Sequence, residues 1–178
     1  MRVGISGTHG TGKTTLAEGL CERLPRHVMA EEPYYLLEEE GYDFGFPPSL
    51  EDYRALLECS VRSLASPEDG IVFDRTPVDY LAYMAAIGAD PVNGVGGEAL
   101  RTALMSLDLL VITVITPETE RTLPPPEMPA LRSRMNEALL DLISADPFDV
   151  WADLPILELD GPLGTRPATV LAALEQLR

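Results

Sequence analysis

Lysine is almost absent from this chain. Lys13 is the only one, and every other member of the 13 Lys and Arg residues is an arginine. Positive charge is scarce as well, because 29 Asp and Glu residues leave a formal net charge of −16. We therefore expect no nucleic-acid partner, which would need a basic face, and no binding to anionic membranes. The two cysteines, Cys21 and Cys59, lack C-x-x-C spacing and predict free thiols rather than a disulfide framework.

Long apolar runs are also missing. No stretch of about 18 apolar residues could form a transmembrane helix, and the first residues lack the pattern of a secretory signal peptide, so a cytoplasmic protein is expected. No repeat or interdomain linker divides the 178 residues. Together with an apolar fraction of 46%, this predicts a single domain over residues 1–178 with a sizeable core.

The single lysine lies in a glycine-rich stretch between a short strand pattern and a helix pattern. Gly7, Gly12, Lys13 and Thr14 match G-x-x-x-x-G-K-[ST], the Walker A phosphate loop. Glycines let successive backbone N–H groups turn inward and bind an anion. Lys13 would reach the β- and γ-phosphates, and the Thr14 hydroxyl would bind Mg²⁺. A turn that binds nothing is the alternative, which the strand–loop–helix context disfavours. The other loop residues expected to contact the nucleotide are His9, Gly10, Thr11 and Thr15.

Strand and helix patterns alternate along the rest of the chain. The first strand pattern contains Val3 and Ile5, and the apolar runs at 71–73 and 109–112 are typical of strands covered on both faces. This alternation predicts an α/β fold with a five-stranded parallel sheet and helices on both faces. The further strands are expected at His27–Ala30, Gly70–Asp74, Leu109–Thr116 and Leu154–Asp160, and the clearest helices at Ser49–Ala65, Thr76–Gly88 and Pro167–Leu177.

An acidic and a basic residue follow one another at the end of the third predicted strand. Asp74 would lie at the carboxyl end of a strand beside the phosphate loop, where a carboxylate can hold Mg²⁺. The alternative is a helix N-cap. Arg75 could neutralise a phosphate as a catalytic residue, or form a structural ion pair with one of the many carboxylates.

A second acidic candidate follows the second predicted strand. Glu32 precedes Pro33, which favours an extended backbone at Glu32. Strand ends of this kind face the ligand crevice of a doubly wound sheet. Glu32 could therefore take a proton from an acceptor hydroxyl as a general base. The alternative is an acid favoured in the first turn of a helix by the helix dipole.

Three motifs occur in the order Gly7–Thr14, Glu32-Pro33 and Asp74-Arg75-Thr76. They resemble those of small P-loop kinases that phosphorylate nucleosides, nucleotides and related metabolites, and the layout is similar to deoxynucleoside and nicotinamide riboside kinases. The resemblance covers all five predicted strands and implies the P-loop NTPase fold with strand order 2-3-1-4-5. It also implies that Glu32 is the general base and that an arginine-rich lid follows the fourth strand.

The lid is expected at about residues 117–146. A proline run at 124–126 stands where deoxynucleoside kinases carry a dense arginine pattern, and prolines prevent this segment from forming a helix. We expect residues 122–129 to be mobile in the free protein and to become ordered when nucleotide and acceptor bind.

Three arginines are candidates for the lid: Arg121, Arg132 and Arg134. On a helix starting near residue 130, Arg132 lies about 60° from the centre of the apolar stripe, and Arg134 lies about 100° away on the other side. We therefore favour Arg132 as a catalytic residue in the cleft and keep Arg134 as a nucleotide contact. Solvent exposure of both is the alternative.

Further candidates could contact the rings of the two substrates. Arg166 follows the last predicted strand in a glycine-rich loop, where it could stack on the nucleotide base or belong to an ordinary turn. Four tyrosines could stack on the acceptor, although tyrosines at helical spacing are more often core residues. They are Tyr34, Tyr35, Tyr80 and Tyr83.

These features predict ATP- and Mg²⁺-dependent phosphoryl transfer to a small-molecule acceptor, a nucleoside, nucleotide or related metabolite. The alternative is a nucleotide-binding regulatory switch with weak ATPase or GTPase activity. ATP is favoured because the guanine-reading motif N-K-x-D is missing. The sequence leaves the oligomeric state and the identity of the acceptor open.

Overall fold

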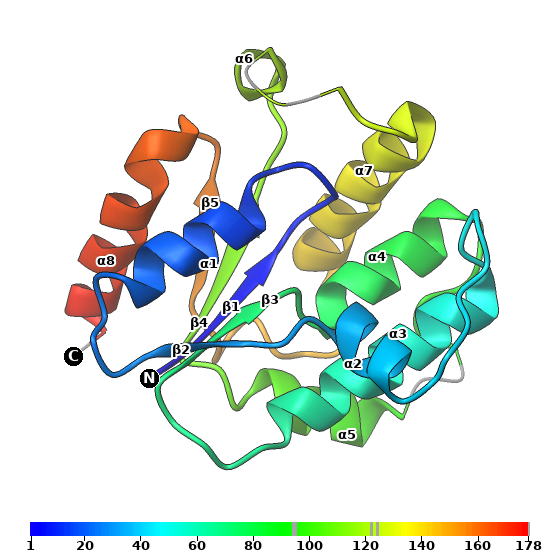
Figure 1. The fold of residues 1–178 in the computed structure, drawn as a ribbon, viewed down its shortest axis with the longest axis horizontal. Helices are drawn as coiled ribbons and strands as arrows, with labels where there is room; N and C mark the ends of the chain where they lie inside the picture. The colour runs from blue at the N-terminus through cyan, green and yellow to red at the C-terminus, as the bar shows by residue number, and fades with distance from the viewer. Residues whose placement is uncertain (94–95, 122, 124, 178) are drawn as a thin grey trace.

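The computed structural model describes residues 1–93, 96–121, 123 and 125–177. Its centre is a parallel sheet of five strands in the order β2-β3-β1-β4-β5 (Figure 1). The fold class and the strand order are therefore confirmed. The strands are β1 (Arg2–Ser6), β2 (Val28–Ala30), β3 (Ile71–Asp74), β4 (Leu109–Thr113) and β5 (Ile156–Leu159).

Most of the predicted strands are longer than the observed ones. The apolar pattern that begins at Leu109 suggests a strand to Thr116, but β4 ends at Thr113. Thr113 is the last residue of β4 with a partner in β5, namely Leu159. A strand continues only while a neighbour supplies hydrogen-bond partners, so pairing and not hydropathy sets its end.

Helices cover both faces of the sheet (Figure 1). One face carries α1 (Lys13–Cys21) and α8 (Arg166–Gln176). The other face carries α3 (Leu50–Leu64), α4 (Pro77–Ala86), α5 (Gly97–Leu104) and α7 (Pro129–Ala145). The shorter elements are α2 (Pro33–Glu39), α6 (Pro117–Glu120) and a 3₁₀ turn, η1 (Leu163–Thr165). None of the helices in the described ranges has the length and apolar character needed to cross a membrane.

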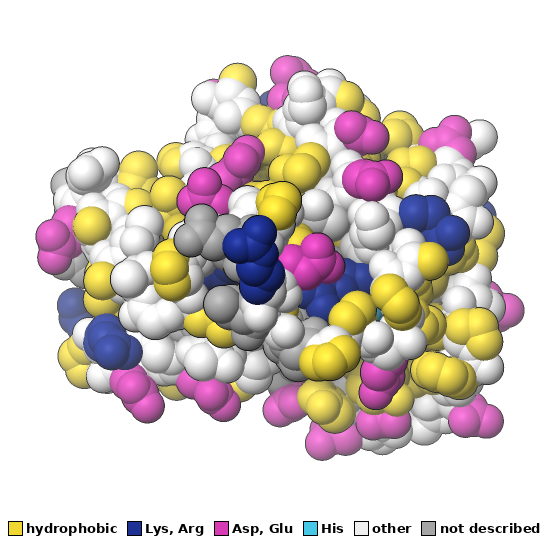
Figure 2. All heavy atoms as spheres, turned by 90° about the horizontal axis from the view of Figure 1, so that it is seen from above, with side chains coloured by type: hydrophobic (Ala, Val, Ile, Leu, Met, Phe, Trp, Pro, Cys, Tyr) yellow, Lys and Arg dark blue, Asp and Glu magenta, His cyan; other side chains and the backbone are white. Residues whose placement is uncertain are grey.

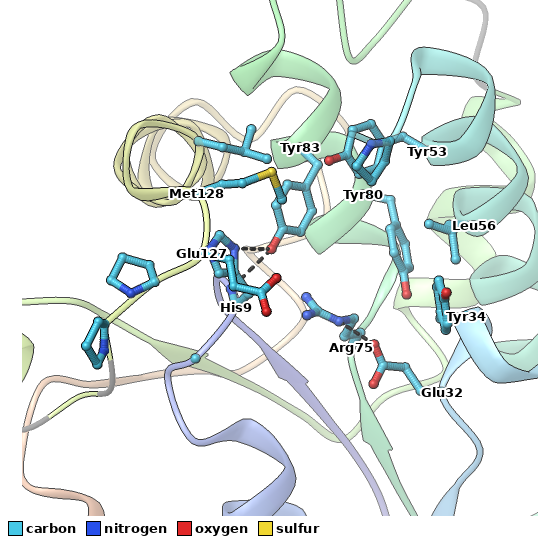
Figure 3. Close-up of a pocket in the computed structure, with 15 residues that line it drawn as sticks. His9, Glu32, Tyr34, Tyr53, Leu56, Arg75, Tyr80, Tyr83, Glu127 and Met128 are labelled. Carbon is cyan, nitrogen blue, oxygen red and sulfur yellow. Dashed lines mark hydrogen bonds and ion pairs between the residues drawn. The ribbon is translucent and has the colours of Figure 1, made fainter. Parts of the chain in front are cut away.

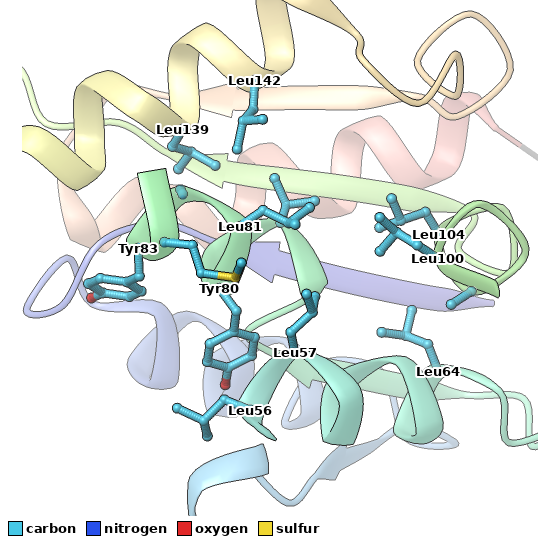
Figure 4. Packing of buried hydrophobic residues seen from close by; sticks show 14 of the residues in the cluster. Leu56, Leu57, Leu64, Tyr80, Leu81, Tyr83, Leu100, Leu104, Leu139 and Leu142 are labelled. Carbon is cyan, nitrogen blue, oxygen red and sulfur yellow. The ribbon is translucent and has the colours of Figure 1, made fainter. Parts of the chain in front are cut away.

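Side chains of the central strands divide the core into two clusters. Leu109 and Val111 of β4 pack with α1 and α8, whereas Leu110 and Ile112 pack beneath α3, α4, α5 and α7. Successive residues of a strand point to opposite faces, so one continuous apolar run supplies both clusters. Figure 4 shows the larger cluster, in which leucines of these helices meet over the sheet.

A capping box determines where α4 begins. Thr76 accepts a hydrogen bond from a first-turn N–H, and the carboxylate of Asp79 accepts from the Thr76 N–H at 2.9 Å. Pro77 occupies the first helical position, where its missing N–H is no loss. The box places the side chain of Asp79 beside the carboxyl ends of β1 and β3.

The segment predicted as a lid is mostly helical. α7 packs along α4, so the chain from residue 129 onward belongs to the core. The lid expected at about 117–146 stays a prediction, and Thr122 and Pro124 of its linker between α6 and α7 lie outside the described residues. The buried stripe of α7 is the predicted one and consists of Leu131, Met135, Leu139 and Leu142.

Candidate active site

Two glycines of the phosphate loop are required by the backbone conformation and by close neighbours. The loop connects β1 to α1 across the carboxyl ends of the strands (Figure 1). A Cβ atom at Gly7 would lie 1.9 Å from Thr113 Oγ1, so only glycine fits there. Gly12 has a φ of 79°, which is the left-handed region that glycine adopts without strain. The loop is thus fitted tightly between β4 and α1.

Two buried side chains hold the loop from beneath. Asp79 Oδ1 accepts a hydrogen bond from the Gly7 N–H at 3.0 Å. Arg166 Nη1 donates to the Thr11 carbonyl at 2.7 Å. Contacts near both ends of the loop fix its conformation before any ligand arrives, and such preorganisation lowers the cost of stabilising charge later.

Lys13 is the first residue of α1, and its ammonium group lies within the loop. Nζ donates to the Thr8 carbonyl at 2.8 Å, and the side chain is 5% exposed. Burial, together with the charge of Arg75, lowers the pKa of Lys13 to about 8, although nearby carboxylates, Asp79 foremost, oppose this shift. An anion bound at the loop would favour the charged ammonium again.

Thr14 and Asp74 meet beside Lys13 and fit a magnesium ion. Thr14 Oγ1 donates to Asp74 Oδ2 at 2.5 Å. The other carboxylate oxygen, Oδ1, is buried and has no hydrogen-bond partner among the described residues. Mg²⁺ keeps several waters and binds few protein oxygens, so one hydroxyl and one carboxylate suffice. Within the described part of the chain no group of three or more His, Cys, Asp or Glu residues could hold a metal.

Two neighbouring hollows open above the strand ends. The phosphate-loop hollow, of about 350 Å³, is lined by Gly12, Lys13, Thr14, Thr15, Asp74, Leu123 and Leu163 together with three shared residues. The aromatic hollow, of about 390 Å³, is lined by His9, Tyr34, Tyr53, Tyr80, Tyr83 and Glu127 among others (Figure 3). Gly10, Glu32 and Arg75 line both hollows. Seen from above, acidic and basic side chains lie together near the middle of this surface (Figure 2).

Arg75 connects the residues that separate the two hollows. Its Nε donates to Glu32 Oε1 at 2.6 Å, and its Nη1 lies 3.4 Å from Asp79 Oδ1. Its backbone has a φ of 76°, an uncommon conformation for a residue other than glycine, which turns the chain from β3 into the cap of α4. The structural ion pair considered as an alternative for Arg75 is present. It joins two candidate catalytic residues, Glu32 and Arg75.

His9 and stacked tyrosines form one wall of the aromatic hollow. The backbone N–H of His9 donates to Tyr83 Oη at 3.1 Å, and His9 Nδ1 lies 3.1 Å from the same oxygen. Tyr53 stacks on Tyr83 with ring centroids 5.2 Å apart. Burial lowers the pKa of His9 to about 4, helped by the charges of Arg75, Arg132 and Lys13. The imidazole is therefore neutral at neutral pH and offers an uncharged polar edge.

The structure brings most of the predicted site residues together. Gly10 and Thr15 line the phosphate-loop hollow. Thr11 is buried, and its hydroxyl donates to the Thr8 carbonyl at 2.8 Å. His9 lines the aromatic hollow instead of the phosphate-loop hollow, because its side chain turns toward Tyr83.

Four predicted residues lie elsewhere. Arg132 is buried in α7 and lines neither hollow. Arg134 is exposed on α7 and lines a separate surface hollow near the end of α4. Arg166 lies beneath the phosphate loop with its guanidinium engaged by backbone carbonyls, and its neighbour Leu163 lines the phosphate-loop hollow instead. Tyr35 is exposed and lines neither hollow.

Two residues of the site escaped the sequence analysis. Asp79 completes the capping box of α4, and the pattern Thr76-Pro77-x-Asp79 could have indicated it, since a Ser or Thr followed three residues later by an acid marks a helix start. Tyr53 gave no signal, because its place in the amphipathic pattern of α3 is that of an ordinary core residue.

Known proteins with similar folds include several kinases. Deoxyadenosine kinase from M. mycoides has a TM-score of 0.68 and 18% identity, with 99% of this chain and 100% of that chain covered. The NadR protein, solved with NAD and AMP-PNP, has a TM-score of 0.66 and 21% identity over 99% of this chain and 49% of that chain. Thymidylate kinase from Candida albicans has a TM-score of 0.63 and 14% identity over 98% and 91% of the two chains. At such identities the likeness shows a shared fold.

The comparison with protein families gives a direct match. No curated protein is significantly similar to the chain. The model of one family, described as AAA domain, matches residues 2–155, which is most of the sequence. The match contains the phosphate loop and all the strands except the last. It also contains the residues that line the two hollows, apart from Leu163. The chain therefore has the fold of the P-loop kinases and belongs to the AAA domain family.

Proposed function

We propose that this protein transfers the γ-phosphoryl group of ATP, with Mg²⁺, to a small-molecule acceptor, a nucleoside, nucleotide or related metabolite. One observation carries the proposal. Two hollows of similar size, about 350 and 390 Å³, meet at Glu32 and Arg75. Phosphoryl transfer needs a donor and an acceptor in line, with charge stabilisation where they meet. A regulatory switch that only binds nucleotide would need the first hollow alone.

The phosphate-loop hollow would hold the donor. Lys13 and the N–H groups of the loop would bind the phosphates, at the N-terminus of α1 where the helix dipole favours anions. Thr14 and Asp74 would hold Mg²⁺, which neutralises the developing charge on the phosphate oxygens. The loop is already held by Asp79 and Arg166, so these groups need little rearrangement when the nucleotide binds.

Glu32 and Arg75 would act where the two substrates meet. An acceptor hydroxyl oxygen forms a bond to the γ-phosphorus while the bond to the β–γ bridging oxygen breaks, and ADP leaves with that electron pair. Glu32 takes the hydroxyl proton as general base. Arg75 Nε donates a hydrogen bond to one carboxylate oxygen of Glu32. This bond would orient the carboxylate so that its other oxygen can accept the proton. Arg75, as a planar and permanently charged donor, can also contact the transferring phosphoryl group.

Related structures support the proposal without deciding it. The deoxyadenosine kinase from M. mycoides was solved with dCMP and dCDP as products. The NadR protein was solved in complexes with NAD and AMP-PNP, and with NR. This chain covers about half of the NadR chain and all of the deoxyadenosine kinase chain, so we infer from the latter only that the same fold accommodates nucleotides.

The experiment is a measurement of ADP release with ATP and Mg²⁺, alone and with a panel of nucleosides, nucleotides and hydroxylated metabolites. A kinase releases ADP slowly alone and faster with its acceptor. Removal of Mg²⁺ with EDTA should abolish both rates, and replacement of Lys13 by alanine should do nearly the same. A rate that no acceptor changes would instead favour the regulatory switch.

A further inference from the structure

His9, the third residue of the phosphate loop, is held in place by Tyr83 of α4. The backbone N–H of His9 donates to Tyr83 Oη at 3.1 Å. The ring of Tyr83 is fixed in turn by Tyr53, which stacks on it at 5.2 Å between centroids, and by the Arg75 guanidinium, 5.8 Å from its centroid. His9 therefore has a defined position on the wall of the aromatic hollow.

The hydrogen bonds of Tyr83 determine which imidazole nitrogen of His9 carries the proton. Tyr83 Oη accepts from the His9 N–H and lies 3.1 Å from His9 Nδ1, and this hydroxyl has no other hydrogen-bond partner among the described residues. Its single proton is therefore donated to Nδ1, which must be the unprotonated nitrogen. Thr8 Oγ1, 3.4 Å from Nδ1, can donate to the same nitrogen. The neutral imidazole consequently carries its own proton on Nε2.

His9 Nε2 is a hydrogen-bond donor that the described part of the chain leaves without an acceptor. It is buried, and a buried N–H without a partner is costly. Glu127, whose side chain is exposed, lines the hollow beside His9 (Figure 3), so rotation of this side chain toward solvent would let a ligand reach Nε2. A ligand oxygen that accepts the hydrogen bond would recover the cost of burial.

The electrostatic field at His9 favours an electron-rich ligand atom at this point. Burial is the main reason that the pKa of His9 is lowered to about 4, and three positive charges contribute. These charges belong to Arg75, Arg132 and Lys13. The carboxylates that line the hollow, Glu32 and Glu127, do not reverse this shift. The imidazole is therefore neutral at pH 7, and the positive field attracts an oxygen rather than a cation to it.

Glu32 offers the opposite chemistry within the same hollow. In Figure 3, His9 and Glu32 lie on either side of Arg75. Glu32 would accept the proton of the reacting hydroxyl, whereas Nε2 of His9 can only donate. His9 lines the aromatic hollow and not the phosphate-loop hollow, so its hydrogen bond serves the acceptor rather than the nucleotide phosphates. A molecule held at both points must present a hydroxyl to one and a separate hydrogen-bond acceptor to the other.

We propose, on the basis of the kinase function above, that His9 Nε2 donates a hydrogen bond to an oxygen of the acceptor, and that Tyr83 positions the imidazole for this contact. His9 is thus a specificity-determining residue and Tyr83 a positioning residue. Besides the hydroxyl that reacts, the acceptor carries a carbonyl, ether or second hydroxyl oxygen that accepts from Nε2. Because Nε2 keeps its proton, His9 acts neither as a nucleophile nor as a base.

The first test reads the position of the proton and needs no substrate. The chain has two histidines, so nuclear magnetic resonance of the full chain labelled with nitrogen-15 histidine gives two sets of ring signals, and His27→Gln assigns them. His9 should show a protonated Nε2 and an unprotonated Nδ1 from about pH 6 to about pH 8. In Tyr83→Phe, which removes the donor to Nδ1, the Nδ1 signal should shift and the second tautomer should appear. A protonated Nδ1 in the unmodified protein would overturn the inference whatever the activity.

The second test separates the two nitrogens of the imidazole by substitution. The side-chain amide of Gln reaches about as far as Nε2, whereas that of Asn reaches only as far as Nδ1. His9→Gln should therefore keep the KM for the acceptor within about threefold, whereas His9→Asn and His9→Ala should raise it about tenfold with kcat within about twofold. His27→Gln, at a histidine outside both hollows, is the control and should change neither quantity.

Binding is measured on protein saturated with AMP-PNP and Mg²⁺, which fill the phosphate-loop hollow. The probes are adenosine, thymidine, nicotinamide riboside, their 5′-monophosphates and shikimate, each titrated while the His9 Nε2–H signal is recorded. ADP release with ATP identifies the probe that is an acceptor. That probe should shift the Nε2–H signal, and His9→Asn should weaken its binding about tenfold.

The possible outcomes separate this inference from the proposed function. A lower kcat at unchanged KM in His9→Asn would mean that Nε2 contacts the transferring phosphoryl group, which would overturn the contact with the acceptor. Equal KM values in all variants would overturn the inference and leave the kinase function standing. A probe that shifts the Nε2–H signal without accelerating ADP release would support the contact and overturn the proposed function instead. If no probe does either, both fail.

Discussion

The phosphate-loop hollow and the aromatic hollow lie side by side but are built in different ways. The first takes half of its lining from one loop and the start of α1, which supply backbone N–H groups, an ammonium group and hydroxyl groups. The second collects side chains from α2, α3, α4 and the segment before α7, and four of them are tyrosines. A local backbone conformation makes the first, and helix packing makes the second.

For the proposed donor, a triphosphate, this difference explains how a strongly acidic protein would bind it. The chain carries a net charge of −16, yet Lys13 and the N-terminus of α1 concentrate positive potential at one point. In the aromatic hollow Arg75, the one basic side chain among the described lining residues, is instead paired with Glu32 and Asp79.

The largest expected effect concerns Glu32, which lines both hollows. Glu32→Gln removes the proposed general base and should lower acceptor-dependent turnover by about 10²–10⁴-fold, while nucleotide affinity stays within about twofold. Glu31→Gln, the exposed neighbour, is the control and should retain turnover. Steady-state kinetics and nucleotide titration measure both quantities. Loss of nucleotide binding in Glu32→Gln would show that Glu32 belongs to the donor site alone.

The next effect tests the phosphate-loop hollow by itself. Lys13→Ala should reduce turnover by about 10²–10³-fold, because it removes one preorganised charge at the phosphates. It should also weaken nucleotide binding, whereas acceptor binding in the aromatic hollow should persist. Circular dichroism should show an intact fold. Arg23→Ala, an exposed residue just after α1, serves as the control. Equal loss in both variants would contradict a specific role for the lysine.

Asp79 supports both hollows, so its removal should affect stability as well as activity. Asp79→Ala breaks a buried contact to Arg75 and frees the Gly7 and Thr76 N–H groups. The free energy of unfolding should fall by about 3 kcal/mol, since the partner charge is left without compensation. Asp141→Ala, on the exposed side of α7, should change it by less than about 0.5 kcal/mol. Urea denaturation measures the free energy of unfolding of both variants. Equal losses would show that Asp79 has no special part in stabilising the two hollows.

The pH dependence of nucleotide binding should reveal the buried ammonium. The pKa of Lys13 is lowered to about 8 in the free protein, and bound phosphates favour its charged form. Above pH 8 the free protein must therefore take up a proton on binding. The dissociation constant should rise about tenfold between pH 7 and pH 9. Lys13→Arg, whose guanidinium stays charged, should bind more weakly but without this rise. Parallel profiles for the two proteins would contradict the assignment.

The smallest effect concerns the arginines of α7. Arg134 lines a surface hollow away from both candidate substrate sites, so Arg134→Ala should change turnover and nucleotide affinity by no more than about twofold. Arg132 is buried and lowers the pKa of His9 through its charge, so Arg132→Ala should reduce turnover more. Kinetics on both variants, at a temperature where each remains folded, test the ranking. A larger loss in Arg134→Ala would reverse it.

Local features of the site were accessible from the sequence because their chemistry resides in consecutive residues. The spacing of Gly7, Gly12 and Lys13 indicated the loop, and the structure shows why each glycine is needed. Pro33 predicted an extended Glu32, which is the N-cap of α2. The alternation of strand and helix patterns predicted the sheet, and the resemblance to P-loop kinases supplied its strand order.

Other features depended on which elements pack together. Tyr53 and Asp79 look like a core residue and a helix cap in the sequence, yet packing brings one to Tyr83 and the other to Gly7. Helical geometry alone ranked Arg132 above Arg134 but could not show that Arg132 would be buried beneath the site.

The sequence by itself therefore determined the phosphate-loop motif and the class of fold, since a glycine-rich turn and a hydrophobic period are properties of neighbouring residues. Only the tertiary structure decided that Arg75 is neutralised by Glu32 and Asp79, and that tyrosines from separate helices form a second hollow. Charge pairing and stacking act through space between residues far apart in the chain, and hydropathy patterns carry no information about such pairs.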